Sequence, residues 1–417
     1  MLFNLSQEGL TYAYDGHILP LQNGTNLIAV SLLRIAVKDK IEVHGQCDER
    51  FATVKEAFQK NFASDLEVGA SFAATVDGKF VVDIWGGYAD AAKTRLWERD
   101  TIVPVLSCTK VMTAICALIL IDRGQLDPDA PVARYWPEFA QAGKEQMPVR
   151  HLLSHQSGLA GFDESIPLEA LYDWDRIVKM LAAQKPWWEP GNHSGYHAIT
   201  FGYLIGEIVR RITKKTLGTF FREEVAIPLN ADFYIGLPEK HDARVAETIP
   251  PPILKPGEPG YYAYDPNSLP GKVMALPSIN NGDYVNDREW RGAEIPASNG
   301  HGNARSMARV GAAMACGGEL DGVRLMGLPT IEKAIEEQCS GNDLVIGTPI
   351  RYGLGFGLNS KEILISPNPR TFYWSGFGGS RLVMDLDARL SWAYTMNKLY
   401  SEIPRDMVIT KALYAAL

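Results

Sequence analysis

The chain contains 417 residues, of which 46% are hydrophobic and 22% are charged. This composition is ordinary for a globular protein with one large domain or two interlocked ones, and it excludes widespread disorder. The net charge of −8, from 41 basic and 49 acidic residues, disfavours nucleic-acid binding through a broad basic surface. No run of about 18 apolar residues occurs, so we expect no membrane span.

The five cysteines are scattered and form no Cys-x-x-Cys pair. This pattern indicates neither a disulfide framework nor a zinc site. The first residues carry no basic segment followed by an apolar stretch and a cleavage site, so we expect no signal peptide and a cytoplasmic location.

Apolar spacing predicts a helix and a β-hairpin where the compact part of the chain begins. Phe51–Phe62 places its apolar side chains on one helical face. Ala70–Val76 and Lys79–Trp85 are rich in β-forming residues and flank Asp77-Gly78. This pair favours a type I′ turn, in which both central residues need positive φ.

The middle of the chain is predicted to be mainly helical, and strands return near its end. Helices are expected at Val111–Arg123, Trp174–Gln184, Ile199–Ile212, Ala304–Ala315 and Pro329–Gln338. The stretch Pro238–Pro296 is rich in Pro, Gly and Asn and is predicted to be largely loop. The last elements expected are a strand at Phe372–Gly376, a hairpin of Ser380–Leu386 and Leu390–Met396, and a helix at Arg405–Leu417.

This order of elements predicts an α+β fold. Hairpins joined by short turns favour an antiparallel sheet over a doubly wound parallel one. We predict an α/β sandwich domain made from residues 42–106 and 337–417. A mainly helical domain of residues 107–336 is inserted between these two parts, and residues 1–41 form an N-terminal extension.

The sharpest local pattern is Ser107-Cys108-Thr109-Lys110, which opens a helix that is apolar on all sides and therefore buried. Ser107 and Lys110 are three residues apart and share one helical face. A buried Lys is costly unless it is paired or neutral, and a partly desolvated Lys can accept the proton of a Ser. The alternative is a Ser N-cap followed by a surface Lys. Cys108 is expected to be a small buried residue that points away from Ser107.

Two later segments carry further candidates. Tyr196 follows a Gly-containing loop and precedes a predicted helix, and a Tyr beside a cationic Lys can act as a base. It can equally be an aromatic plug between helices. The segment from Trp374 to Ser380 has closely spaced glycines at a strand, which either let a ligand or backbone approach or form a β-bulge.

In this order, the three segments resemble the active-site elements of class C β-lactamase-like serine hydrolases, most closely those of family VIII carboxylesterases. The resemblance runs from about Glu42 to the C-terminus and includes Asp83–Gly87, His151–Leu159 and Asn299–Arg305. It implies a β-lactamase/penicillin-binding-like fold. It also implies Ser107 as nucleophile, Lys110 as its activator, Tyr196 as general base and acid, and the N–H groups of Ser107 and Phe377 as the oxyanion hole.

The chain departs from the lactamases at two places. Trp374-Ser375-Gly376 stands where they carry Lys-Thr-Gly or His-x-Gly, so the cation that grips a carboxylate is missing. Tyr196-His197-Ala198 stands where they carry Tyr-x-Asn. Both departures resemble the esterases, and a neutral aromatic pocket suits an uncharged ester. The predicted pocket residues are Trp374, Ser375, Gly376, His197 and Trp187, although Trp187 can equally be core.

Two other kinds of hydrolase are disfavoured. His151 and His155 are spaced i, i+4, as are His193 and His197, but neither pair is His-Glu-x-x-His, so we expect no metal and no cofactor. We expect the His151 motif to fix a loop through hydrogen bonds to backbone. No Gly-x-Ser-x-Gly occurs, which argues against a standard α/β-hydrolase.

The sequence therefore predicts a serine hydrolase that cleaves short-chain carboxylic esters through an acyl-enzyme on Ser107. Its expected partner is a small-molecule ester, with no nucleic acid and no membrane, and the oligomeric state is left open. The alternatives on this scaffold are a β-lactamase or D-amino-acid peptidase, and an acyltransferase that passes the acyl group to an alcohol. A third is a non-catalytic binding or sensor protein, against which the intact Ser107, Lys110 and Tyr196 argue.

Overall fold

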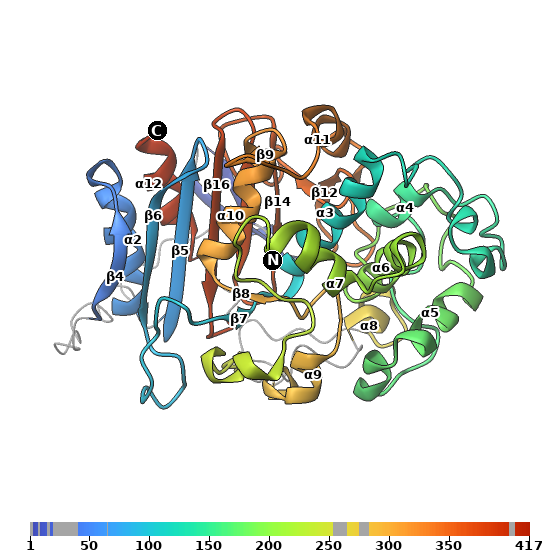
Figure 1. Ribbon diagram of the computed structural model, residues 1–417, viewed down its shortest axis with the longest axis horizontal. Helices are drawn as coiled ribbons and strands as arrows, with labels where there is room; N and C mark the ends of the chain where they lie inside the picture. The colour runs from blue at the N-terminus through green and yellow to red at the C-terminus, as the bar shows by residue number, and fades with distance from the viewer. Residues whose placement is uncertain are drawn as a thin grey trace.

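A nine-stranded antiparallel sheet organises the part of the chain that is described (Figure 1). The computed structural model describes residues 3–6, 9–14, 17–19, 41–64, 66–252, 265–274, 283–399 and 405–417. The strand order is β11-β12-β13-β14-β15-β16-β5-β6-β4. These strands are β4 (Val43–Cys47), β5 (Gly69–Val76), β6 (Lys79–Gly87), β11 (Cys339–Asn342), β12 (Pro349–Tyr352), β13 (Gly357–Leu358), β14 (Thr371–Ser375), β15 (Arg381–Asp385) and β16 (Leu390–Met396). Both ends of the chain thus contribute to one sheet.

Helices cover the two faces of this sheet. On one face α10 (Ala304–Ala315) packs on β5, β15 and β16, and Gly311 leaves room for Ser391. On the other face Phe58 of α2 (Ala52–Ala63) packs on Tyr394, with 6.1 Å between ring centroids. Side chains alternate along a strand, so Ser391 and Tyr394 of β16 point to opposite faces. The C-terminal helix α12 (Met407–Ala415) packs against α2.

A second group of helices gathers around α3 (Thr109–Asp122), on the right of Figure 1. Both α6 (Thr200–Thr213) and α7 (Leu217–Phe221) pack on α3, while α4 (Val149–Leu153) and α5 (Trp174–Ala183) pack on α6. The side chains of α3 are buried from its start to Leu120, as the apolar sequence predicts. None of the helices in the described ranges has both the length and the apolar character needed to cross a bilayer.

The remaining helices are short: α8 (Leu269–Met274), α9 (Arg288–Gly292) and α11 (Leu328–Ala334). Further strands are β7 (Val103–Pro104), β8 (His301–Gly302), β9 (Glu319–Leu320) and β10 (Val323–Arg324). In the N-terminal region, β1 (Phe3–Ser6), β2 (Gly9–Tyr14) and β3 (His17–Leu19) form a separate three-stranded antiparallel sheet.

The predicted hairpins are confirmed. Asp77 and Gly78, which join β5 to β6, have φ angles of +49° and +77°, as a type I′ turn requires. The second hairpin is β15–β16, preceded by β14. The antiparallel sheet flanked by helices is also as predicted, and α10 has the predicted bounds.

Two predicted segments differ from expectation. The helix predicted at Pro329–Gln338 ends at Ala334, because the Ala334 carbonyl accepts the N–H of Leu354 and the chain then enters β11. The predicted loop at Pro238–Pro296 contains α8, α9 and two 3-10 turns among its described residues. The division into two domains stays a prediction, and α10, assigned to the helical part, lies on the sheet.

A buried ion pair ties the end of the chain to the sheet. Glu67 and Arg405 lie within 3.1 Å, with side chains 0% and 1% exposed. Tyr394 of β16 donates to Glu67 Oε1 at 2.6 Å, and Asn61 of α2 donates to Tyr394 Oη and to the Arg405 carbonyl oxygen. Burial raises the pKa of Glu67 to about 7, against the opposing effects of Arg405 and Tyr394.

We expect Arg405→Met to lower the free energy of unfolding by about 3–5 kcal/mol, because it leaves Glu67 buried without its cation. Without the cation the pKa of Glu67 rises further, so folding binds a proton at still higher pH. The loss should therefore be greater at pH 8.5 than at pH 6, as measured by urea denaturation. Adding Glu67→Gln should remove this extra pH dependence, and an equal loss at both pH values would contradict the assignment.

Candidate active site

Ser107 lies where the chain turns from β7 into the buried helix α3. A 3-10 turn, Leu106–Cys108, runs directly into α3. Leu106 has a φ of +47°, a left-handed conformation that costs energy for a residue with a side chain. The Thr109 hydroxyl donates to the Leu106 carbonyl oxygen at 2.6 Å and accepts from the Gly300 N–H at 2.8 Å. These bonds hold the turn in the shape that presents Ser107.

Lys110 meets Ser107 in a dry environment. Its Nζ atom lies 3.1 Å from Ser107 Oγ and donates to the carbonyl oxygens of Ala198 at 2.7 Å and Ala297 at 2.9 Å. Lys110 is 1% exposed, and burial lowers its pKa well below the usual value. A neutral amine has two N–H groups and one lone pair. With both N–H groups on carbonyls, the lone pair is left for the Ser107 proton.

Tyr196 approaches the same oxygen from another direction. Its hydroxyl donates to Ser107 Oγ at 2.6 Å, and Lys110 Nζ lies 4.7 Å from the centre of its ring. Burial raises the pKa of Tyr196, so the phenol is protonated at neutral pH. In this arrangement Ser107 Oγ accepts from Tyr196 while its own proton faces Lys110. The geometry equips Tyr196 to donate a proton and Lys110 to take one up.

The His151 motif fixes the loop that carries Tyr196, as predicted, through His155 and Gln156, whereas the buried Nδ1 atom of His151 has no hydrogen-bond partner among the described residues. His155 Nδ1 accepts from the His197 N–H at 3.1 Å, and the His155 carbonyl oxygen accepts from the Gly195 N–H at 2.9 Å. Gln156 Nε2 donates to the Gly191 carbonyl oxygen at 2.9 Å. Burial lowers the pKa of His155 well below its usual value, which keeps the ring neutral and able to accept at Nδ1.

Strand β14 brings Trp374 against Tyr196. Their rings stack at 5.5 Å between centroids, and Trp374 also stacks on His155 at 5.8 Å. Gly376 follows the strand and approaches the turn before Ser107, where a Cβ atom would lie 2.4 Å from the Val105 carbonyl oxygen. Only glycine permits that approach. The three segments singled out in the sequence therefore meet in space.

The predicted oxyanion donors lie near this approach. Phe377 follows Gly376 in a turn closed by the Gly379 N–H, which donates to the Gly376 carbonyl oxygen at 3.2 Å. Within the described ranges no group accepts a hydrogen bond from the Phe377 N–H. The oxyanion role of the Ser107 and Phe377 N–H groups stays a prediction.

The other predicted pocket residues have partners of their own. Trp187 is half-buried and donates from Nε1 to Asp163 at 2.6 Å. The two ring nitrogens of His197 lie 2.6 Å from Ser157 Oγ and 2.6 Å from the Gly195 carbonyl oxygen, and burial lowers the pKa of His197 to about 3. Both nitrogens of His197 are thus engaged within the protein. The pocket roles of Trp187 and His197 stay predictions.

Two other side chains near Ser107 have contacts that limit their chemistry. Cys108 is fully buried, its Sγ atom lies 3.6 Å from the Trp374 carbonyl oxygen, and burial raises its pKa to about 12. It therefore remains a thiol, as expected of a small core residue. The Ser375 hydroxyl accepts from Arg381 Nε at 3.0 Å. Arg381 also pairs with Asp406 at 2.6 Å, so its charge is balanced.

Sequence reasoning missed several groups at the site. The Ala198 and Ala297 carbonyls that bind Lys110 carry no side-chain signal, and Ala297 is 187 positions away in the chain. Asp343 accepts a hydrogen bond from the Tyr196 N–H at 2.9 Å. Arg381 pairs directly with Ser375 across β14 and β15, so the strand register could have revealed it.

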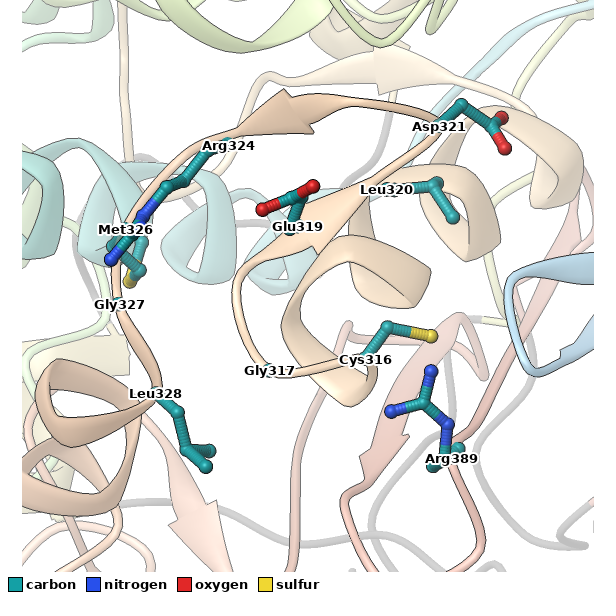
Figure 2. Close-up of a pocket in the computed structure, with 10 residues that line it drawn as sticks. All are labelled: Cys316, Gly317, Glu319, Leu320, Asp321, Arg324, Met326, Gly327, Leu328 and Arg389. Carbon is teal, nitrogen blue, oxygen red and sulfur yellow. The ribbon is translucent and has the colours of Figure 1, made fainter.

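Two hollows lie in the described part of the chain, and none of the site residues described above lines either of them. One, of about 440 Å³, lies between α10 and α11, and Figure 2 shows the Cys316 side chain pointing towards Arg389. The other, of about 630 Å³, lies between the start of α5 and the end of α6 and includes Tyr172, Trp174 and Arg210. Burial raises the pKa of the Cys316 thiol.

The fold and the Ser107 site are those of a serine hydrolase, and the chain belongs to the β-lactamase family, whose model, described as "Beta-lactamase", matches residues 58–416. It is 33% identical over 380 residues to a protein described as "Esterase/beta-lactamase LipL" from Mycobacterium tuberculosis. The matched residues make up 87% of this chain and 84% of that protein. These matches confirm the resemblance inferred from the motifs. The chain is thus an esterase/β-lactamase-like serine hydrolase.

Solved structures give the same fold. A family VIII carboxylesterase is 43% identical, with a TM-score of 0.84, over 90% of this chain and all of that one. A penicillin-binding protein homologue from Caulobacter crescentus is 38% identical, with a TM-score of 0.82 and the same coverage of both chains. The predicted β-lactamase/penicillin-binding-like fold is therefore confirmed.

We expect Lys110→Ala and Tyr196→Phe each to lower kcat by about 10²-fold or more, because each removes a proton-transfer group from Ser107 Oγ. The double variant should lose much less than the product of the two losses, since the groups act as one unit. Steady-state hydrolysis of p-nitrophenyl butyrate measures this. Lys144→Ala is the matched control, because Lys144 is also buried among carbonyl oxygens, and it should lower Tm without a comparable fall in kcat.

Proposed function

We propose that the protein is a serine carboxylesterase that hydrolyses short-chain, uncharged carboxylic esters. The observation that carries this proposal is the convergence of Lys110 Nζ and Tyr196 Oη on Ser107 Oγ, at 3.1 and 2.6 Å. A single oxygen that faces one proton acceptor and one proton donor is suited to nucleophilic attack followed by protonation of a leaving group.

In the first half of the reaction, Ser107 Oγ attacks the ester carbonyl carbon as its proton passes to Lys110 Nζ. The negative oxygen of the tetrahedral intermediate accepts hydrogen bonds from the Ser107 and Phe377 N–H groups. Collapse breaks the bond to the alcohol, which leaves with the proton of Tyr196, and Lys110 returns a proton to Tyr196. The acyl group is then bound to Ser107 Oγ.

Water completes the cycle. It attacks the acyl carbonyl carbon while its proton passes to the neutral Lys110 and Tyr196 pair. Collapse of the second tetrahedral intermediate breaks the bond to Ser107 Oγ, which takes the proton back, and the carboxylic acid leaves. Every proton released by a nucleophile is thus returned to a leaving group, and no cofactor is required by the steps.

The preference for an uncharged ester rests on Trp374. Its ring stacks on Tyr196 beside Ser107, and it stands in the strand position where the lactamases carry a cation. Arg381, the cation nearest along the neighbouring strand, is already paired with Asp406. An anionic lactam would therefore meet an aromatic surface where it needs a positive charge. The family VIII carboxylesterase at 43% identity supports the same choice.

A β-lactamase activity is the second candidate, because the printed name of the 33% identical relative includes both activities. Side-by-side hydrolysis of nitrocefin and p-nitrophenyl butyrate distinguishes the two. We expect kcat/KM for the ester to exceed that for nitrocefin. The opposite order would make the lactam the preferred substrate.

We expect Ser107→Ala to abolish ester hydrolysis while Tm stays near that of the wild type, because only the attacking oxygen is removed. A fluorophosphonate should add once to the wild-type protein and not to the variant, as seen by intact-mass spectrometry. Cys108→Ala is the control. It should still be labelled once, because the buried thiol does not react with the fluorophosphonate. Persistent labelling of Ser107→Ala would rule out Ser107 as the nucleophile.

We expect Trp374→Lys to raise the ratio of nitrocefin to ester turnover by about 10-fold or more, because a charge-assisted hydrogen bond contributes about 1.5–3 kcal/mol. Trp374→Met is the matched control, since it removes the ring and adds no charge. Melting curves must accompany both variants, because an unpaired buried charge destabilises a fold. If both remain folded and give the same ratio, Trp374 does not occupy the carboxylate position.

A further inference from the structure

Asp343 lies in the turn between β11 and β12, at the edge of the sheet, and its side chain reaches the loop that carries Tyr196. Asp343 is 1% exposed. Its Oδ1 atom accepts hydrogen bonds from the N–H groups of Val345, Ile346 and Tyr196, each at 2.9 Å. Two of these bonds close its own turn, and the third crosses 147 positions of sequence to the residue that contacts Ser107 Oγ.

The other oxygen of Asp343 binds a second aromatic residue of the site. Oδ2 accepts from the Tyr352 hydroxyl at 3.0 Å. The Tyr352 ring lies 5.8 Å from Trp374 and 5.0 Å from His155 between centroids. One carboxylate therefore holds the backbone of Tyr196 and the ring that packs behind Trp374.

A neighbouring backbone bond strengthens this connection. The Leu344 N–H donates to the Ser194 carbonyl oxygen at 2.9 Å. The turn between β11 and β12 therefore makes two hydrogen bonds to the Tyr196 loop, one at Ser194 and one at the Tyr196 N–H. The tyrosine comes from the segment before α6, whereas the turn belongs to the sheet. Tyr196 is thus placed against Ser107 by an element from the far end of the chain.

We propose that Asp343 is a positioning residue for ester hydrolysis, which sets the distance from Tyr196 Oη to Ser107 Oγ and fixes the aromatic surface that faces the substrate. The proposal rests on the function proposed above. A displacement of about 1 Å at a reacting group can cost about 10²-fold in rate, so removal of this brace should act mainly on kcat.

The charge of Asp343 gives its role a signature that a merely structural residue would lack. Burial is the main reason that the pKa of Tyr196 is raised, and the negative charge of Asp343 raises it further. Asp343→Asn keeps one oxygen for the three N–H groups and removes the charge. It should lower the pKa of Tyr196, the proton donor, and so shift the falling, alkaline limb of the kcat/KM profile to lower pH.

The chain offers a matched control in Asp385. This residue is also fully buried, and its Oδ1 accepts from the N–H groups of Asp387 and Ala388 at 3.0 Å. Its Oδ2 accepts from the Tyr414 hydroxyl at 2.9 Å. Asp385 thus makes the same kinds of turn and tyrosine hydrogen bonds as Asp343, but it has no bond to Tyr196. It also lies away from the site, because in the sheet it pairs with Thr371, at the opposite end of β14 from Ser375.

The experiment compares Asp343→Ala, Asp343→Asn, Asp385→Ala and Asp385→Asn in the full chain, with p-nitrophenyl butyrate as substrate. We expect Asp343→Ala to lower kcat by about 10²-fold with KM changed less than about threefold. Asp343→Asn should lose less and shift the pH profile downwards. The Asp385 variants should lower Tm but leave kcat and the pH profile near those of the wild type.

Two outcomes would overturn the proposal. One is a wild-type kcat and pH profile in Asp343→Asn, which also decides the matter if Asp343→Ala fails to fold. The other is an equal fall in kcat in the Asp385 variants. Ser107→Ala, measured in parallel, separates the two proposals: if it retains hydrolysis the proposed function fails, and if it is inactive only the role of Asp343 is in question.

Discussion

Lys110 lies on the first turn of a helix that is buried along most of its length, where a charged amine is costly. The carbonyl oxygens of Ala198 and Ala297 accept two of its hydrogen bonds, and its third contact is Ser107 Oγ. Burial lowers the pKa of Lys110 well below its usual value, and the two carbonyl contacts leave the lone pair of a neutral amine for the nucleophile. The strained turn at Leu106, the loop before α6 and the approach of Gly376 all serve to close the site around that contact.

The assembly of the sheet from both chain ends brings together site residues that lie far apart in the sequence. Ser107 follows β7, Tyr196 precedes α6, Trp374 lies in β14 and Gly376 directly follows that strand. The antiparallel order places β14 near the turn that precedes α3, and the β11–β12 turn then reaches the Tyr196 loop. Long-range pairing thus sets the distances of 3.1 and 2.6 Å at which Lys110 Nζ and Tyr196 Oη approach Ser107 Oγ.

The sequence predicted those features whose causes are local. The Asp77-Gly78 turn follows from the need for positive φ, and α3 follows from an unbroken apolar run. The placement of Ser107, Lys110 and Tyr196 came from the resemblance of three motifs, and their spacing alone left surface and core alternatives open. Asp343 could not be found in this way, because Asn-Asp after a short strand signals only a turn, and its bond to Tyr196 spans 147 positions.

The end of α11 shows the same limit. Its sequence favours a helix to Gln338, but the Ala334 carbonyl binds Leu354 and the Gln338 N–H binds Tyr352. Tertiary hydrogen bonds therefore replace the last helical turn and begin the sheet edge. The carbonyls around Lys110 are a comparable case, since every residue has a carbonyl oxygen and only the fold decides which ones converge.

A second buried lysine, Lys144, can be compared with Lys110 by the groups that its amine contacts. Lys144 Nζ donates to three carbonyl oxygens, those of Gln141, Ala182 and Gln184, at 3.0, 2.9 and 2.6 Å. Three acceptors match the three N–H groups of an ammonium ion, and burial lowers the pKa of Lys144 to about 8. Lys110 has two carbonyl acceptors and a hydroxyl in the third position. Burial lowers the pKa of both lysines, but only Lys110 has a hydroxyl in its third position, so only its lone pair, when the amine is neutral, faces a proton that it can accept.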